Sequence, residues 1–274
     1  MLRLRVLSAL VGVPILIGLA VLGGGWYVAA AVAGGVAATF ELFSMLKTSG
    51  FRPVVPLGLA LTVAIIADAL ATDARIMPAI LVVAMLVGLA QMMIRTDPTG
   101  AIVDWGLTLV PALYVGGTMH YLILLRFLPE GLFWILVVFV CTWMCDIAAF
   151  FVGRRWGNRR LAPRISPGKS VEGAIGGLVG AVLAAIVLGP LLAGVALATG
   201  PGTLVSVSVL RLAGLGLVIG VCAIAGDLME SFIKRQCGAK DSGALIPGHG
   251  GVLDRIDSVL LAVVGAYFYV VTTA

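Results

Sequence analysis

The chain has 274 residues, of which 61% are hydrophobic and only 11% are charged. Soluble domains usually carry about a quarter charged residues, so this composition excludes a soluble globular protein and indicates a single polytopic membrane domain over residues 1–274. The net charge of +5 does not indicate nucleic-acid binding, because no basic face interleaved with aromatic residues accompanies it.

Nine apolar stretches reach, or nearly reach, the length needed to cross a hydrocarbon layer of about 30 Å. They are continuous rather than alternating, so they predict helices and not the strands of a barrel. In chain order the stretches are 4–22, 26–46, 54–72, 76–94, 105–125, 131–152, 174–198, 207–226 and 253–272. We therefore predict an all-α polytopic bundle of nine transmembrane helices, with amino-terminal helices in 1–130 and catalytic helices in 131–274.

The distribution of Lys and Arg predicts the orientation of these helices. If the amino terminus is cytoplasmic, all but three of the 18 Lys and Arg fall in cytoplasmic segments, as the positive-inside rule requires. The exceptions are Arg75, Arg126 and Arg211. This orientation puts the carboxyl terminus outside a cytoplasmic (inner) cell membrane. It also places the polar segments 153–173 and 227–252 on the cytoplasmic face, where nucleotides and Mg²⁺ are found.

The first polar cluster surrounds Asp146, near the cytoplasmic end of the predicted helix 131–152. An acid inside a membrane span is costly and is usually paired or functional, so a structural ion pair with Arg154 is the alternative to a catalytic role. Ala149, Phe150 and Gly153 share the helical face of Asp146. This pattern predicts a small cleft beside the carboxylate.

The second cluster is SPGKSVEG, residues 166–173. Its Lys169 and Ser170 are like the end of a phosphate-binding P-loop, but Pro163 stands where that motif requires glycine and no strand is evident, which excludes a Walker fold. We expect a flexible turn before a helix whose free N–H groups attract phosphate. In the alternative, ordinary interpretation, Ser170 caps the helix and Gly173 packs.

The third cluster is the richest in charge. Asp227, Ser231 and Lys234 fall on one helical face at i, i+4 and i+7, and Asp254 and Asp257 begin the last predicted helix. A first-turn acid that favours the helix dipole is the alternative for Asp254 alone. Carboxylates hold hard cations such as Mg²⁺, while Lys and Arg hold phosphates. The mixture predicts metal-assisted phosphate chemistry.

These residues resemble the signature of the phosphatidate cytidylyltransferases, also called CDP-diacylglycerol synthases. The matching positions are Ser231-Phe232-Ile233-Lys234-Arg235, Lys240-Asp241, Gly243, Ile246-Pro247, His249-Gly250-Gly251-Val252 and Asp254-Arg255-Ile256-Asp257. Two further motifs of the family are similar to Asp146, Ala149, Phe150, Gly153, Arg154 and Gly157, and to SPGKSVEG. The resemblance covers about residues 141–260. Phe150 departs from it where tyrosine is frequent, and Gly168 departs where lysine is common.

The resemblance implies a Mg²⁺-dependent enzyme that transfers CMP from CTP to phosphatidic acid, giving CDP-diacylglycerol and pyrophosphate for phospholipid biosynthesis. We expect two divalent sites, with a monovalent cation as a further option. The expected partners are CTP, phosphatidic acid and membrane lipids. Glycine-rich helix faces, as at Gly173, Gly177 and Ala181, are typical of close helix packing, and a homodimer is a further expectation.

The site residues are assigned from this resemblance together with their chemistry. The expected metal ligands are Asp227 and Asp254, with Asp257 and Asp146 as weaker candidates. The residues expected to be catalytic are Asp227 and Asp254 together with three cations that act on phosphates. These cations are Lys234, Arg235 and Arg255. The residues expected to bind substrate are Lys169, Ser231, Lys240, Asp241 and His249.

Two other functions remain open. A CTP-dependent polyprenol kinase shares the membrane, the nucleotide and the acidic segment, but it transfers a phosphoryl group and releases CDP. A secondary transporter couples ions through intramembrane acids such as Asp68 and Asp146. The transporter predicts an internal repeat of interrupted helices, and the sequence shows no convincing one.

Overall fold

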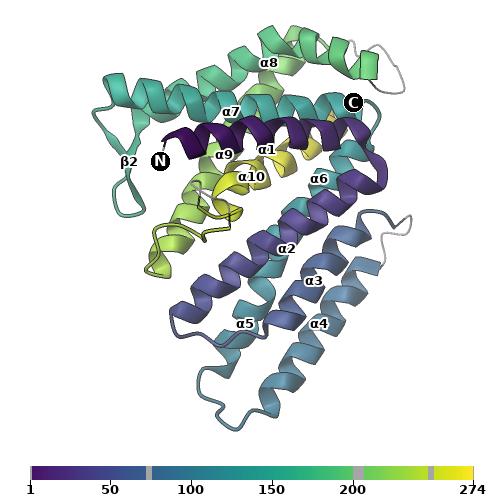
Figure 1. Ribbon diagram of the computed structural model, residues 1–274, viewed down its shortest axis with the longest axis vertical. Helices are drawn as coiled ribbons and strands as arrows, with labels where there is room; N and C mark the ends of the chain where they lie inside the picture. Colours follow the sequence, from purple (N-terminus) through teal and green to yellow (C-terminus); the bar gives the residue numbers. More distant parts are fainter. Residues whose placement is uncertain (1, 72–75, 200–206, 246–249, 274) are drawn as a thin grey trace. The chain divides into compact units, whose positions relative to one another are not determined.

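The computed structural model describes residues 2–71, 76–199, 207–245 and 250–273, so His249 lies outside the described residues. The described chain is almost entirely helical (Figure 1). The elements are α1 (Leu2–Leu22), α2 (Gly24–Thr48), α3 (Val55–Asp68), α4 (Ile76–Met93), α5 (Ala101–Pro111), the π-helical turn η1 (Ala112–Gly116), α6 (Gly117–Phe127), α7 (Gly131–Trp156), β1 (Arg160–Ala162), β2 (Ser166–Ser170), α8 (Val171–Thr199), α9 (Val209–Gln236) and α10 (Leu253–Thr272).

Seven helical segments among the described residues are long and apolar enough to cross a membrane, which confirms a multi-pass, mainly helical membrane protein. They are α2, α4, the continuous segment Ala101–Phe127, α7, α8, α9 and α10. Helix α3 has 14 residues, about 21 Å at 1.5 Å per residue, which is shorter than a full span. The count of nine spans and the orientation of the termini stay predictions.

The segment Ala101–Phe127 remains one helix although Pro111 lies inside it. Proline has no N–H to donate, and its ring clashes with the preceding turn of an α-helix. The π-helical turn η1 follows Pro111 directly, and both features are known places of helix distortion. The span expected over 105–125 therefore continues through the proline.

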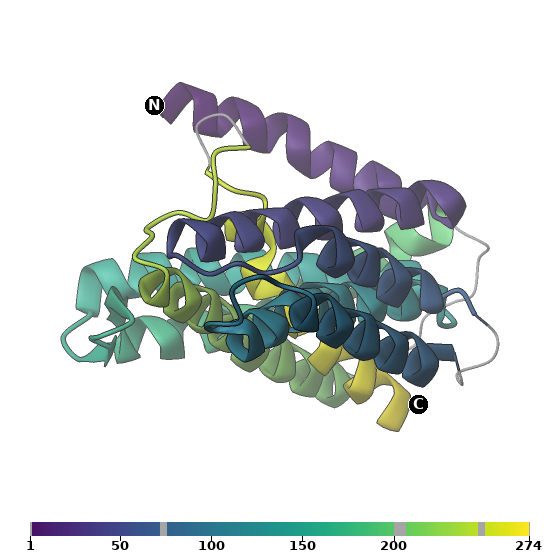
Figure 2. The same cartoon turned by 90° about the horizontal axis from the view of Figure 1, so that it is seen from below.

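The chain divides into two compact units. The first contains residues 1–10, 24–124 and 236–255, and the second contains residues 11–23, 125–235 and 256–274. In the first unit, each of the helices α2 to α5, dark purple to dark teal in Figure 2, packs against the next helix along the chain. Buried Thr62 donates a hydrogen bond of 3.2 Å to Thr39 of α2. The single membrane domain expected from the sequence stays a prediction.

In the second unit α8 lies along α7, with the β1–β2 hairpin at one end of the pair (Figure 1). Glycines allow this close approach, as the sequence predicted for Gly173 and Gly177. A Cβ atom added to Gly177 would lie 3.0 Å from the Cys145 carbonyl oxygen, and one added to Gly180 would lie 2.6 Å from the Ala148 Cβ. Helix α7 can therefore contact the backbone of α8 directly.

The segment expected to be a flexible turn is instead part of a two-stranded antiparallel hairpin. Arg160 pairs with Ser170 and Ala162 pairs with Ser166, with an irregularity between the two pairs. The fold class is still all-α, with this short hairpin as its one β element among the described residues. Strands of three and five residues carry too little alternation to be seen in a sequence, and they form because the ends of α7 and α8 bring them together.

Candidate active site

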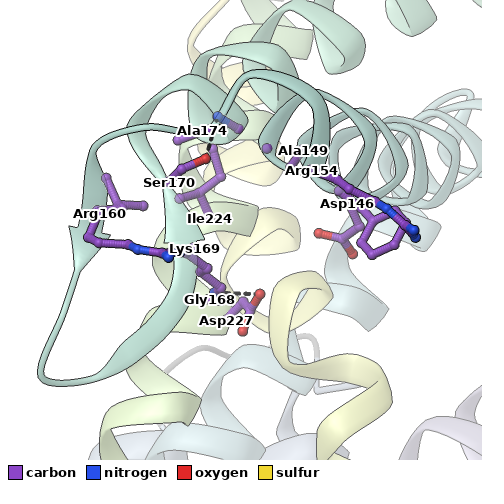
Figure 3. A pocket seen from close by; sticks show the side chains of 15 residues that line it. Asp146, Ala149, Arg154, Arg160, Gly168, Lys169, Ser170, Ala174, Ile224 and Asp227 are labelled. Atoms are coloured by element: carbon purple, nitrogen blue, oxygen red, sulfur yellow. Dashed lines mark hydrogen bonds and ion pairs between the residues drawn. The ribbon is translucent and has the colours of Figure 1, made fainter.

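A cavity of about 620 Å³ lies within the second unit. Its walls come from the last turns of α7, the hairpin, the start of α8, and α9 (Figure 3). The lining residues are Asp146, Ala149, Phe150, Gly153, Arg154, Gly157, Arg160, Leu161, Gly168, Lys169, Ser170, Gly173, Ala174, Ile224 and Asp227. The cleft predicted beside Asp146 is thus present, and it also receives the hairpin and α9.

Small residues set the width of the cavity where α7 meets α8. A Cβ atom on Gly173 would lie 2.9 Å from the Ala149 carbonyl oxygen and 3.2 Å from the Gly153 Cα. Ser170 caps α8, because its hydroxyl oxygen accepts the Gly173 N–H at 3.1 Å. Both parts of the ordinary interpretation of this motif are therefore correct. The residue before Ser170, Lys169, in addition forms an ion pair.

That neighbour, Lys169, reaches from β2 to α9. Its ammonium nitrogen lies 2.5 Å from Asp227 Oδ2 (Figure 3). Asp227 Oδ1 also accepts a long hydrogen bond of 3.4 Å from the Ser231 hydroxyl one helical turn later. The second and third polar clusters of the sequence therefore meet at one carboxylate in the wall of the cavity.

Asp146 is exposed, and its carboxylate points into the cavity (Figure 3). Among the described residues the structure forms no ion pair between Asp146 and Arg154, so the structural alternative for Asp146 receives no support. Arg154 and Arg160 line the same cavity. Two acids and three cations thus surround one volume.

Asp227 also belongs to an acidic group that the sequence interpretation did not identify as a whole. One carboxylate oxygen each from Asp227, Glu230 and Asp257 lies within 4.8 Å of the others, the one such group among the described residues. Glu230 is fully buried, and its Oε2 lies 2.5 Å from the Lys234 ammonium. Three converging carboxylates are the oxygen donors that a hard divalent cation takes, so this group fits Mg²⁺.

A glycine brings the two contributing helices together. A Cβ atom on Gly226 would lie 2.5 Å from the Asp257 carbonyl oxygen, so the backbones of α9 and α10 are in close contact one residue before Asp227. Asp257 is further oriented by the Ser258 N–H, which donates to its Oδ1 at 2.6 Å. The backbone contact therefore sets the separation of the carboxylates.

The described site residues predicted from the sequence are divided between the two units. Asp146, Lys169, Asp227, Ser231, Lys234, Arg235 and Asp257 belong to the second unit. Arg235 donates from Nε to the Ile165 carbonyl of the hairpin at 3.3 Å. Lys240, Asp241, Asp254 and Arg255 belong to the first unit, where Lys240, Asp241 and Arg255 are exposed. The roles assigned to all these residues stay predictions.

Asp254 has a structural role in addition to any other. Its Oδ2 accepts the Ser242 N–H at 2.9 Å and the Gly251 N–H at 3.0 Å. The bond to Gly251, three residues earlier, is what a carboxylate in the first turn of a helix commonly makes. Asp254 is not one of the three converging carboxylates, and its assignment as a metal ligand stays a prediction.

Sequence reasoning missed Glu230 and the cavity arginine Arg160. Glu230 was detectable, because it lies three residues after Asp227 and four before Lys234, which is same-face spacing on a helix. Arg160 gave no local signal, since its place depends on the hairpin. Glu41, inside the predicted span 26–46, was also passed over although an acid within a span is unusual.

Comparison with known proteins places this geometry in context. The sequence model described as "Cytidylyltransferase family" matches residues 3–273. The chain is 37% identical over 275 residues to the phosphatidate cytidylyltransferase of Pseudomonas aeruginosa, covering 96% of this chain and 94% of the relative. It is 30% identical over 297 residues to that of a Synechocystis strain, covering 97% and 96%.

Other relatives match a shorter part of the chain at higher sequence identity. The phosphatidate cytidylyltransferase of Haemophilus influenzae is 43% identical over 145 residues, which are 51% of this chain and 46% of that relative. The Brucella suis relative is matched over 48% of its length. The chain therefore spans about half the length of both the Haemophilus and the Brucella relatives.

Proposed function

Because this chain belongs to the cytidylyltransferase family, whose model matches residues 3–273, we propose that it transfers CMP from CTP to phosphatidic acid for phospholipid biosynthesis. The products are CDP-diacylglycerol and pyrophosphate. The relatives that match nearly the whole chain are named phosphatidate cytidylyltransferases. The structural observation that carries the proposal is a group of three converging carboxylates, one of which, Asp227, pairs with Lys169 in the wall of a cavity.

The reaction explains why the site combines both signs of charge. A phosphate oxygen of phosphatidic acid attacks the α-phosphorus of CTP, and the bond from that phosphorus to the oxygen bridging to the β-phosphate breaks. The bonding electrons leave with pyrophosphate. Because the lipid phosphate is the nucleophile, no residue needs to form a covalent intermediate. The work of the protein is to position two anions and to stabilise their charge.

The carboxylates Asp227, Glu230 and Asp257 would hold Mg²⁺. When bound, the cation supplies positive charge to phosphate oxygens. We also propose a second divalent cation, for which Asp146 and Asp254 each stay a candidate ligand, and a monovalent cation as a further component.

The cations of the cavity hold the phosphates of CTP and of the lipid. Arg154 and Arg160 offer planar guanidinium groups that bind phosphate through paired N–H donors, and Lys169 supplies a compact charge between the hairpin and α9. Phe150 lines the cavity with 59% of its surface exposed. We assign to this apolar edge the glycerol and the first part of the acyl chains, while the rest of each chain stays in the bilayer.

The site faces the cytoplasm in this proposal. The hairpin region carries the densest group of cations in the chain, which the positive-inside rule assigns to the cytoplasmic side of an inner membrane, and CTP is available there. A homodimer remains a prediction. Gly173 and Gly177, two of the residues on which it was based, contact α7 of the same chain.

The proposal is tested with purified protein in detergent, phosphatidic acid, Mg²⁺ and CTP labelled at the α-phosphate. We expect the label to enter the lipid phase with an equal amount of pyrophosphate in the aqueous phase, and both to be lost with EDTA. Label that stays aqueous as CDP while a lipid gains phosphate would instead establish a lipid kinase.

A further inference from the structure

Glu41 of α2 is a buried acid, 3% exposed, and its hydrogen-bond partners among the described residues come from the far end of the sequence. Its Oε1 accepts the Val252 N–H at 2.9 Å, and its Oε2 accepts the Leu253 N–H at 2.9 Å. The Ser242 hydroxyl also donates to Oε2, at 3.1 Å. All these residues belong to the first unit. One carboxylate therefore joins both described ends of the α9–α10 connection, residues 237–245 and 250–252.

Ser242 links Glu41 to Asp254. While its hydroxyl donates to Glu41, the same oxygen accepts the Asp254 N–H at 3.3 Å, and the Ser242 N–H donates to Asp254 Oδ2 at 2.9 Å. The first N–H groups of α10 have no partners inside the helix. Here Glu41 and Ser242 satisfy the N–H groups of Val252, Leu253 and Asp254 from outside it.

The backbone closes around the Glu41 carboxylate. A Cβ atom on Gly243 would lie 2.7 Å from Glu41 Oε1, and a Cβ atom on Gly251 would overlap both Ser242 Oγ and Glu41 Oε2. These two glycines allow the connection to reach the acid. A buried carboxylate without such donors is strongly unfavourable, so Glu41 favours the arrangement in which Ser242, Val252 and Leu253 donate to it.

We propose that Glu41 is a positioning residue of the reaction, which fixes the start of α10 and thereby the direction of the Asp254 carboxylate. This inference rests on the proposed function. Glu41 itself touches neither substrate nor cation in this proposal. It acts through Ser242 and the first residues of α10, a helix that also carries Asp257 three residues after Asp254.

The test compares Glu41→Gln with Asp104→Asn in the full-length protein in detergent. Asp104 is a matched control, since it is a buried acid of the same unit that accepts the Arg52 N–H at 2.7 Å and pairs with Arg95 at 2.8 Å. Three quantities are measured, namely hydrogen–deuterium exchange of the peptide 236–255, Mn²⁺ binding followed by electron paramagnetic resonance, and steady-state kinetics.

We expect Glu41→Gln to speed exchange in that peptide about tenfold or more, since its anchoring bonds are weakened. We also expect Mn²⁺ affinity to fall about 10- to 100-fold, as when a residue that orients a metal ligand is changed. The kcat should fall while the KM for CTP at saturating cation changes little. Asp104→Asn should alter none of these, although it lowers thermal stability.

Unchanged exchange and Mn²⁺ affinity in Glu41→Gln would overturn the inference, because exchange and binding require no turnover. A lack of cytidylyltransferase activity in the unmodified protein would instead count against the proposed function and leave these two readouts in place. If Glu41→Gln does not fold, Ser242→Ala replaces it. That variant removes only the hydroxyl between the two carboxylates, and wild-type exchange in it would equally overturn the inference.

Discussion

Lys169 on the hairpin and Asp227 on α9 form an ion pair of 2.5 Å in the wall of the cavity. The pair joins residues that are distant in the sequence, and both side chains are partly exposed, at 26% and 32%. The ammonium lies on a carboxylate that a divalent cation would also bind. Under the proposed function, Mg²⁺ held at Asp227 would compete with Lys169, and the ammonium would then be available to bind phosphate.

The first prediction concerns the competition between Lys169 and a divalent cation for Asp227. Lys169→Met should lower kcat/KM for CTP about 10- to 100-fold, because a charged hydrogen bond to phosphate contributes about 1.5–3 kcal/mol. At the same time it should strengthen Mn²⁺ binding to the protein without nucleotide, because the competing ammonium is gone. Both quantities are measured by CTP titration and by electron paramagnetic resonance.

Arg164→Met is the control for Lys169→Met. Arg164 lies exposed between the two strands and does not line the cavity, so its removal lowers the charge of the hairpin equally. Identical kinetics and Mn²⁺ affinities in the two variants would contradict this competition at Asp227.

The second prediction concerns the contact between α7 and α8. Gly173→Ala should destabilise the protein by about 1–3 kcal/mol, the usual cost of overpacking, because the new Cβ would lie 2.9 Å from the Ala149 carbonyl oxygen. Gly194→Ala, in the same helix, is the matched control, since a Cβ there meets nothing within 4 Å. The midpoint of thermal unfolding in detergent distinguishes them. Equal midpoints would show that α7 and α8 do not pack as described.

The apolar helices were predictable because hydrocarbon demands long continuous apolar runs. Their ends were less so. Helix α9 continues to Gln236, whereas the apolar run stops at 226, since hydropathy detects what lies in lipid and not where hydrogen bonding ends. The helix therefore carries Asp227 and Glu230 on consecutive turns. Helical spacing had already placed Asp227, Ser231 and Lys234 on one face, although the length of the apolar run gave no sign that the helix extends this far.

The candidate site was predictable where chemistry is concentrated locally. Lys169 and Asp227 were both selected from their own motifs, but nothing in the sequence indicated that they pair. Glu41 illustrates the limit most clearly. Its hydroxyl partner Ser242 is 201 positions away, and a single sequence carries no signal that connects such residues.

The third prediction concerns topology. In a protein whose four cysteines are replaced, a cysteine at Arg164 should react with a membrane-impermeant maleimide only after the cells are opened. A cysteine at Thr273, just past α10, should react in intact cells. These results follow from a cytoplasmic amino terminus and nine spans. Protection of the Thr273 position in intact cells, with labelling after opening, would require an even number of spans.

The fourth prediction tests the acidic group. Asp227→Asn, Glu230→Gln and Asp257→Asn should each reduce Mn²⁺ affinity at least about tenfold, because each removes a charged oxygen donor from a set that hard cations require. Glu230→Gln is the decisive variant, since it changes a fully buried side chain by one atom at a position that the sequence motifs did not select. It also removes the partner of Lys234, so Lys234→Met is measured beside it to separate loss of the ion pair from loss of the ligand.

Exposed Asp97, changed to Asn, serves as the control for charge alone. If Glu230→Gln binds Mn²⁺ as Asp97→Asn does while Asp227→Asn does not, Glu230 holds Lys234 in place and is not a ligand.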